Sequence, residues 1–254
     1  MKVALTGGAT GIGLEVAARL KQAGHTVHVF DVNKPQSNTD RWIPTNMSSP
    51  ESVVAAIEAA DGPYNALINN AGVPPREGLE ETVLRVNFFS LRSFLNGLLP
   101  QLAPNASIVT TASLAGAQWR ENLDQVKQLM ALNESALPEF IAQHKIDATQ
   151  AYCLSKEALI AMTVTDTEAL LAQGFRSNTV SPGAVSTDIL QDFYSAFGDR
   201  LTKSVARVGR PGNADEVAEV IVFLASAHSR WIRGQDIVVD GGISAMHQRD
   251  KLNL

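Results

Sequence analysis

Short runs of apolar, β-branched residues recur along the chain, with helix-length segments between them. The runs predict strands at residues 3–6, 26–30, 42–44, 66–69, 107–112, 178–181 and 236–239. The segments between them predict helices at residues 12–22, 50–60, 79–99, 152–173 and 213–226. Strands that alternate with helices are typical of βαβ units, whose parallel sheet is buried on both faces. We therefore predict an α/β fold: a doubly wound, Rossmann-type parallel sheet of about seven strands with helices on both faces.

Two segments interrupt this alternation. Residues 118–150 are amphipathic and charged, which predicts one or two extra helices inserted before the helix at 152–173. Residues 184–208 carry Phe193, Tyr194 and Phe197 but have no clear place in the sheet, and long connections of this kind are usually lids or binding loops. No repeat, linker or charge run marks a boundary, so we expect residues 1–254 to form one domain.

Composition excludes several classes of function. No run approaches the roughly 18 apolar residues that cross a bilayer, and 21 basic against 26 acidic side chains, without a basic block, disfavour nucleic acid as a partner. The five histidines show no paired ligand spacing, so we expect no metal site. A single cysteine, Cys153, excludes an internal disulfide, and the chain begins directly with a strand-like pattern, so we expect a cytoplasmic protein without membrane attachment.

A glycine-rich loop, Gly7-Gly8-Ala9-Thr10-Gly11-Ile12-Gly13, follows the first predicted strand and opens the first helix. Glycines here allow a tight turn and a close approach to a pyrophosphate, whose charge the amides of the helix N-terminus stabilise. Asp31 ends the second strand, 18 residues beyond Gly13, where a carboxylate can bind the adenosine ribose diol. Its charge would repel a 2′-phosphate, so we expect NAD rather than NADP, although Lys34 could partly neutralise that repulsion.

Tyr152 and Lys156 are four residues apart at the start of a helical pattern, which places them on one helix face. A phenol with a pKa of about 10 is a weak base at neutral pH, but a neighbouring ammonium and a cationic nicotinamide both favour the phenolate. The pair alone is a weak signal, since a half-buried tyrosine beside a snorkelling lysine fits it too. Residues 69–72, Asn87, Ser113 and residues 182–183 lie at or near strand ends, so one cleft could collect them all.

Taken in order, these motifs resemble the short-chain dehydrogenase/reductase family over nearly the whole chain except residues 118–150. The resemblance implies that Tyr152 is the general acid/base and that Lys156 binds the nicotinamide ribose and lowers the Tyr152 pKa. It also implies that Ser113 binds the substrate oxygen and that Asn87 holds a water in a proton relay. The cofactor would be NAD, bound by Gly7, Thr10, Gly11, Ile12, Gly13, Asp31, Asn46, Met47, Asn69, Ala71, Gly72, Tyr152, Lys156, Pro182, Gly183, Val185 and Thr187.

This chain departs from the family pattern at two places. Asn46 stands where an acid commonly holds the adenine amino group, so its side-chain carbonyl would have to serve, with Asn69 and Ala71 along the adenosine. The 39 residues from Ser113 to Tyr152 exceed the usual spacing, which leaves the pocket wall and the usual dimer surface open. The resemblance still implies a homo-oligomer, either a dimer or a tetramer.

Within the family, residues 118–150, 229–234 and 240–242 resemble coniferyl-alcohol dehydrogenases and 3-alpha-hydroxysteroid dehydrogenases. A medium-sized apolar or aromatic alcohol or carbonyl substrate is implied, bound by Ser113, Tyr152, Phe193, Tyr194 and Phe197. Two alternatives remain open: a non-catalytic dinucleotide-sensing regulator, and a dehalogenase-type relative without a cofactor. The joint presence of the serine, tyrosine and lysine argues against the first, and the intact glycine loop against the second.

Overall fold

Seven parallel strands form the central sheet of the computed structural model, which describes residues 1–254. Their order across the sheet is β3-β2-β1-β4-β5-β6-β9, which confirms the predicted doubly wound topology. The strands are β1 (Lys2–Thr6), β2 (Thr26–Asp31), β3 (Arg41–Pro44), β4 (Tyr64–Asn69), β5 (Leu102–Thr111), β6 (Arg176–Pro182) and β9 (Asp236–Val239). The chain order reverses between β1 and β4, and open α/β sheets bind their ligands at the carboxyl ends of the strands beside such a reversal.

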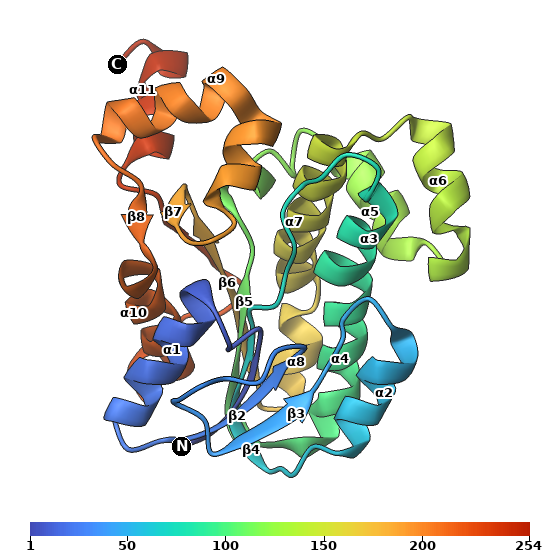
Figure 1. The fold of residues 1–254 in the computed structure, drawn as a ribbon, viewed down its shortest axis with the longest axis vertical. Helices are drawn as coiled ribbons and strands as arrows, with labels where there is room; N and C mark the ends of the chain where they lie inside the picture. Colours follow the sequence, from blue (N-terminus) through green and yellow to red (C-terminus); the bar gives the residue numbers. More distant parts are fainter.

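Two apolar clusters cover the two faces of the sheet. On one face α1 (Gly11–Gln22) packs beside α10 (Ala214–Ala225), and on the other lie α2 (Pro50–Glu58), α4 (Leu91–Leu98) and α7 (Ala148–Thr165) (Figure 1). Alternate residues of one strand enter opposite clusters: Val3 and Leu5 join the α1 side, whereas Ala4 joins the α7 side. This alternation explains why the predicted strands read as unbroken apolar runs.

Capping boxes set where two of these helices begin. Asp147 accepts a hydrogen bond from the backbone N–H of Gln150, whose side chain bonds back to the Asp147 N–H, so α7 starts at Ala148, four residues before the predicted start. At the start of α10 the Glu216 side chain accepts a 2.7 Å hydrogen bond from the Asn213 N–H, as part of a second capping box.

The segment predicted as one helix at 79–99 is divided. It comprises α3 (Glu80–Leu84), a π-helical turn at Arg85–Ser90 and α4, and a 3-10 turn at Leu99–Gln101 follows. Single π turns inside α-helices often mark functional sites. Asn87 lies within this turn.

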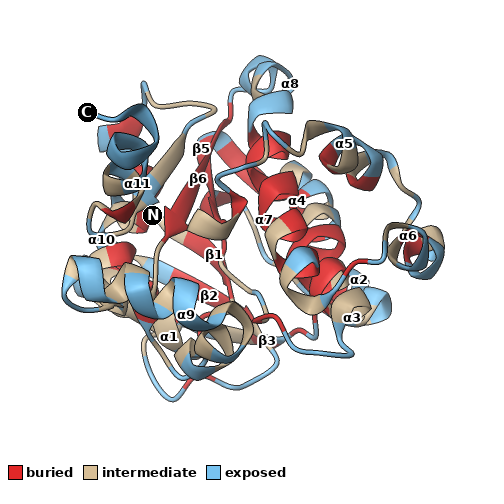
Figure 2. Ribbon diagram, turned by 90° about the horizontal axis from the view of Figure 1, so that it is seen from above, coloured by how far each residue is buried: buried red, intermediate tan, exposed pale blue.

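The insert contains two helices, α5 (Leu123–Ala131) and α6 (Leu137–His144), in agreement with the prediction. The expectation of an irregular segment at 184–208 was wrong: β7 (Val185–Ser186) pairs with β8 (Gly212–Asn213), and α9 (Leu190–Val208) follows, kinked at Gly198. Two further helices, α8 (Thr167–Ala172) and α11 (Ile243–Leu252), and 3-10 turns at Leu114–Gly116, Glu134–Ala136 and Ala227–Ser229 complete the fold. Figure 2 shows that α9 and α11 are largely exposed, whereas the sheet and α7 are buried.

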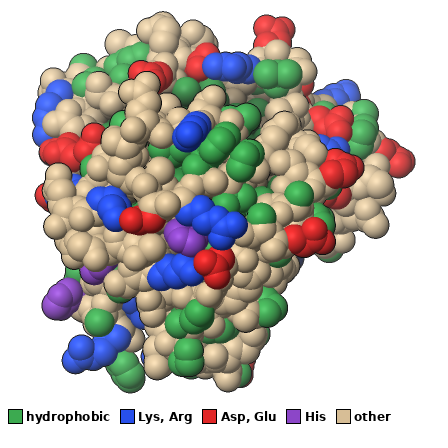
Figure 3. Space-filling view, turned by 60° about the horizontal axis from the view of Figure 1, so that its bottom comes forward, with side chains coloured by type: hydrophobic (Ala, Val, Ile, Leu, Met, Phe, Trp, Pro, Cys, Tyr) green, Lys and Arg blue, Asp and Glu red, His purple; other side chains and the backbone are tan.

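Acidic and basic side chains are interspersed on the face shown in Figure 3, without a continuous basic area, and the net charge of the chain is -5. None of the helices combines the length and apolar character needed to cross a membrane.

Candidate active site

A cavity of about 1040 Å³ opens at the carboxyl edge of the sheet, beside the reversal between β1 and β4. It is large enough to take a dinucleotide together with a second small molecule. Most of the site residues expected from the sequence line it: Gly7, Thr10, Gly11, Ile12, Asp31, Asn46, Met47, Ala71, Gly72, Ser113, Tyr152, Lys156, Pro182, Gly183, Val185, Thr187, Phe193 and Phe197. Four expected residues, Gly13, Asn69, Asn87 and Tyr194, do not line it.

Three of these four residues lie away from the cavity for identifiable reasons. Gly13 lies inside α1, where an added Cβ would stand 1.9 Å from the Gly7 carbonyl oxygen, so its glycine permits close packing rather than cofactor contact. The Asn69 side chain is buried, and the neighbouring Asn70 lines the cavity in its place. Tyr194 is on α9 between Phe193 and Phe197, which share a helix face because they are four residues apart, so its side chain leaves that face.

Asn70 lies in the 69–72 stretch that was expected at the cleft, but it was not expected among the residues that bind the cofactor. Its Nδ2 donates a 2.9 Å hydrogen bond to the Gly7 carbonyl oxygen, and its Oδ1 accepts one of 3.1 Å from the Thr111 hydroxyl. The amide thus ties the glycine loop to the end of β5. The alternation of side chains along a strand could have indicated Asn70. Asn69 is the last residue of β4 and its side chain is buried, so the side chain of the next residue points the other way and can face the cavity.

The glycine loop has the shape that a pyrophosphate requires. Gly7 and Gly11 have φ values of +68° and +54°, and a Cβ at Gly7 would meet the Ala71 Cα at 2.7 Å. No side chain caps the N-terminus of α1, so its first backbone N–H groups are available to an anion.

Asp31 is held beside this loop by the backbone. Its two carboxylate oxygens accept hydrogen bonds from the Ala9 N–H at 2.9 Å and the Asn33 N–H at 2.8 Å, and each retains a free lone pair that could bind a ribose hydroxyl. Lys34 does not line the cavity. The expected role of the Asn46 carbonyl does not fit, because its Oδ1 already accepts hydrogen bonds from the N–H and the hydroxyl of Ser48.

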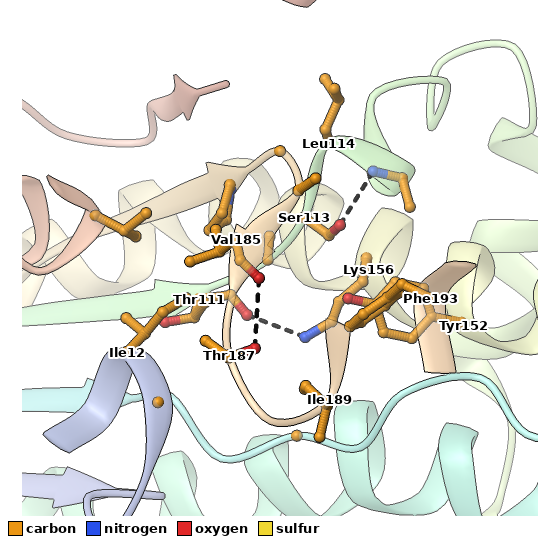
Figure 4. A pocket seen from close by; sticks show the side chains of 18 of the residues that line it. Ile12, Thr111, Ser113, Leu114, Tyr152, Lys156, Val185, Thr187, Ile189 and Phe193 are labelled. Atoms are coloured by element: carbon orange, nitrogen blue, oxygen red, sulfur yellow. Dashed lines mark hydrogen bonds between the residues drawn. The ribbon is translucent and has the colours of Figure 1, made fainter. Parts of the chain in front are cut away.

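Tyr152 and Lys156 are both buried on α7 at the other end of the cavity (Figure 4). Lys156 Nζ lies 5.6 Å from the centre of the Tyr152 ring and donates a 3.1 Å hydrogen bond to the Thr111 carbonyl oxygen. Burial lowers the pKa of Lys156 to about 8. The ammonium is still mostly protonated at pH 7, but it loses its proton more readily than an ordinary lysine does.

Burial also raises the pKa of Tyr152, and interaction with the Ser113 hydroxyl partly offsets that rise. The direction is opposite to the lowering expected from Lys156, because desolvation dominates in the chain alone. Ser113 has a structural role too, since its Oγ accepts a 3.1 Å hydrogen bond from the Ala115 N–H and so caps the 3-10 turn at Leu114–Gly116. The same hydroxyl therefore serves the backbone and the phenol.

Asn87 is fully buried behind the cavity wall. Its side chain bonds both backbone groups of Val73, accepting from the N–H at 2.8 Å and donating to the carbonyl at 3.0 Å. An added Cβ on Gly72 would lie 3.2 Å from Asn87 Oδ1 and 3.5 Å from Lys156 Nζ, so these groups converge. Asn87 therefore fixes the loop after β4 close to the ammonium.

Comparison with known proteins identifies the family. A family model described as short chain dehydrogenase matches residues 1–124, and one described as Enoyl-(Acyl carrier protein) reductase matches residues 136–244. A coniferyl-alcohol dehydrogenase of Pseudomonas sp. strain HR199 is 34% identical over 249 residues, which cover 97% of each chain. The chain belongs to the short-chain dehydrogenase/reductase family.

Two further relatives of this dehydrogenase/reductase resemble it over nearly its whole length. A 3-alpha-hydroxysteroid dehydrogenase/carbonyl reductase of Comamonas testosteroni is 28% identical over 250 residues, 96% of each chain. The crystal structure of the 3-alpha-hydroxysteroid dehydrogenase from Pseudomonas sp. B-0831 complexed with NADH superposes with a TM-score of 0.83 at 30% identity, covering 98% of each chain. As a member of this family, the protein is an oxidoreductase that depends on NAD or NADP.

Aromatic rings surround Tyr152 in this short-chain dehydrogenase/reductase. The rings of Phe193 and Phe197 on α9 lie 5.2 Å and 6.4 Å from the Tyr152 ring, edge to face. The start of α9 is tied to the loop after β4 by Arg76, whose guanidinium donates two hydrogen bonds to the Asp192 carboxylate, at 3.2 Å and 2.9 Å. Burial raises the pKa of Cys153 to about 11, so this neighbouring thiol is a poor nucleophile. No group of three metal-ligating side chains occurs in the chain.

Proposed function

We propose that this protein is an NAD-dependent alcohol dehydrogenase and carbonyl reductase that acts on a medium-sized apolar or aromatic substrate, with Tyr152 as the general acid/base. One observation carries the proposal: the buried phenol shares a single cavity with Ser113 and Lys156 at one end and with the glycine loop and Asp31 at the other. A group that transfers a proton and a group that binds a dinucleotide therefore face the same space.

The chain's residues fit the cofactor. The glycine loop and the free N–H groups of α1 would hold the pyrophosphate, Asp31 the adenosine ribose and Lys156 the nicotinamide ribose. The Asp31 carboxylate disfavours a 2′-phosphate, and the NADH complex of the similar Pseudomonas sp. B-0831 enzyme agrees with NAD. Bound NAD supplies the hydride acceptor.

In the oxidation direction, Ser113 would hold the substrate hydroxyl while Tyr152 accepts its proton. Lys156 stabilises the phenolate through its positive charge, which opposes the effect of burial on the phenol. Asn87 would position the loop and a water that passes the proton from Lys156 to solvent. The same steps in reverse serve carbonyl reduction.

The apolar walls support the substrate class. Phe193 and Phe197 face the phenol, and aromatic surfaces of this kind favour a coniferyl-alcohol-like or hydroxysteroid-like substrate. The similarity to a coniferyl-alcohol dehydrogenase and to a 3-alpha-hydroxysteroid dehydrogenase/carbonyl reductase supports the same classes. We also propose a homo-oligomer, because Val238 on the edge strand β9 and Trp231 before it are exposed apolar side chains.

A panel of aromatic primary alcohols, hydroxysteroids and simple ketones, assayed with NAD(H) and NADP(H), tests the function. We expect turnover with NAD, and Tyr152→Phe should lower kcat by about 10²- to 10⁴-fold while leaving the NADH dissociation constant unchanged. Undiminished turnover in that variant would refute the assigned base. NADH binding without turnover of any compound would indicate a dinucleotide-sensing regulator instead.

A further inference from the structure

Glu157 is a buried carboxylate that the chemistry above does not use. It follows Lys156 on α7, is 5% exposed and lines the cavity. Its Oε2 accepts a 2.7 Å hydrogen bond from Asn122 Nδ2, at the start of the insert. No side chain donates to its Oε1, and no cationic side chain forms an ion pair with the carboxylate. Glu157 therefore presents an unused hydrogen-bond acceptor to the substrate side of the cavity.

An incompletely paired buried carboxylate is costly, because its desolvation is not repaid by protein donors. Burial accordingly raises the pKa of Glu157, and the hydrogen bond from Asn122 opposes that rise. A neutral side chain at position 157 would be enough to hydrogen-bond Asn122 and so connect the insert to α7. A carboxylate is favoured over a neutral side chain when a ligand donates a hydrogen bond to its second oxygen, because hydrogen bonds to charged acceptors are stronger.

We infer that Glu157, held by Asn122, binds a second hydroxyl group at the end of the substrate distant from the reacting carbon. Glu157 lies five residues beyond Tyr152, which is about 7.5 Å along the helix axis. Cys153, one turn before Glu157 on the same helix face, also lines the cavity, whereas Tyr152 lies about 140° away around the axis of α7. Tyr152 and Glu157 line one cavity, so a substrate with a rigid aromatic or alicyclic body between its two oxygens can reach from one to the other.

One cationic side chain also reaches this end of the cavity. Arg200 on α9 lines the same cavity and lowers the pKa of the Cys153 thiol, although the charges of Glu157 and Asp147 act in the opposite direction. A hydroxyl can donate to Glu157 Oε1, and Arg200 offsets part of the attraction that the carboxylate has for a substrate cation.

This inference rests on the proposed function, and matched substrates test it. The holoenzyme is assayed with 4-hydroxycinnamyl alcohol, 4-methoxycinnamyl alcohol and cinnamyl alcohol, which share the reacting group and differ in the distal donor. We expect kcat/KM for the hydroxyl compound to exceed that for the other two by about tenfold or more. Glu157→Met should abolish the preference, and Glu157→Gln, which keeps an acceptor oxygen, should retain part of it. Glu139→Met, the same change at an exposed site on α6, should leave it intact.

Binding separates this inference from the proposed function. The NADH complex is titrated with 4-propylphenol and with propylbenzene, neither of which can react. We expect the phenol to bind about tenfold tighter to the wild type and equally to Glu157→Met. Turnover without any hydroxyl preference, or a preference unchanged in Glu157→Met, would overturn the role of Glu157 alone. Selective phenol binding without turnover would support it and overturn only the alcohol dehydrogenase. A stronger preference for 4-(aminomethyl)cinnamyl alcohol would show that the subsite takes cations instead.

Discussion

Lys156 Nζ donates a 3.1 Å hydrogen bond to the carbonyl oxygen of Thr111, and no carboxylate pairs with this buried ammonium. The lysine therefore carries its charge into the protein without a counter-ion. A buried, unpaired ammonium lowers the free energy of unfolding but serves the active site, and enzymes commonly lose stability at catalytic positions in this way. Its pKa of about 8, against an ordinary value of 10.5, reflects that cost.

Lys156→Met should consequently abolish turnover and stabilise the protein at pH 7, by up to about 3 kcal/mol in the free energy of unfolding. Below pH 8 the lysine is protonated in both states, so the folded state bears the full cost of burying the charge. As the pH rises from 8 to 10.5 only the unfolded state still binds the proton, and the wild type gains stability relative to the variant. Urea unfolding at pH 7 and pH 10 measures this. If Lys156→Met were more stable than the wild type by the same free energy at both pH values, burial of the charged lysine would not be the cause. Lys127→Met, at an exposed position, serves as the control.

Asp31→Ser should shift the cofactor preference toward NADP. The substitution removes the negative charge that would repel a 2′-phosphate, and the serine hydroxyl can still accept one of the two backbone hydrogen bonds, from Ala9 or Asn33. We expect the ratio of kcat/KM for NADP to that for NAD to rise by about tenfold or more. Steady-state kinetics with both cofactors measure the ratio, and Asp124→Ser, at an exposed position of α5, should leave it unchanged. An unaltered ratio in Asp31→Ser would mean that another residue selects the cofactor.

Most of the site residues that follow the strands were predictable from the sequence. Buried parallel strands appear as clear apolar runs, and their carboxyl ends must lie at one edge of the sheet. Tyr152, Ser113 and the glycine loop meet at that edge. Side-chain direction was less predictable: one residue of register decides that Asn70 rather than Asn69 faces the cavity. The π turn around Asn87 and the polar helix α11, which buries only Ile243, leave no clear periodicity, so neither could be read from the chain.

Gly13→Ala should destabilise the protein and weaken NADH binding together. The added methyl would stand 1.9 Å from the Gly7 carbonyl oxygen and 2.6 Å from Asn70 Nδ2, so α1 and the glycine loop must separate. We expect a loss of about 1 to 3 kcal/mol in the free energy of unfolding. Gly212→Ala is the matched control, because its nearest neighbour is an ordinary 3.6 Å contact. Thermal unfolding with and without NADH measures both effects, and a variant as stable as the control would contradict the close packing.

Phe193→Ala should raise KM for bulky apolar alcohols without changing the affinity for NADH. The Phe193 ring lies 5.2 Å from the Tyr152 ring on the substrate side, so its loss removes apolar surface that would bury the substrate. Burial of an aromatic side chain contributes roughly 1.5 to 3 kcal/mol, and we expect KM to rise by about tenfold. Tyr194→Ala, one residue further along α9 but outside the cavity, should leave KM unchanged. Steady-state kinetics of the two variants with cinnamyl alcohol and with ethanol separate the outcomes, because ethanol is too small to reach the ring. Equal KM effects in both variants would show that α9 acts only by holding the fold together.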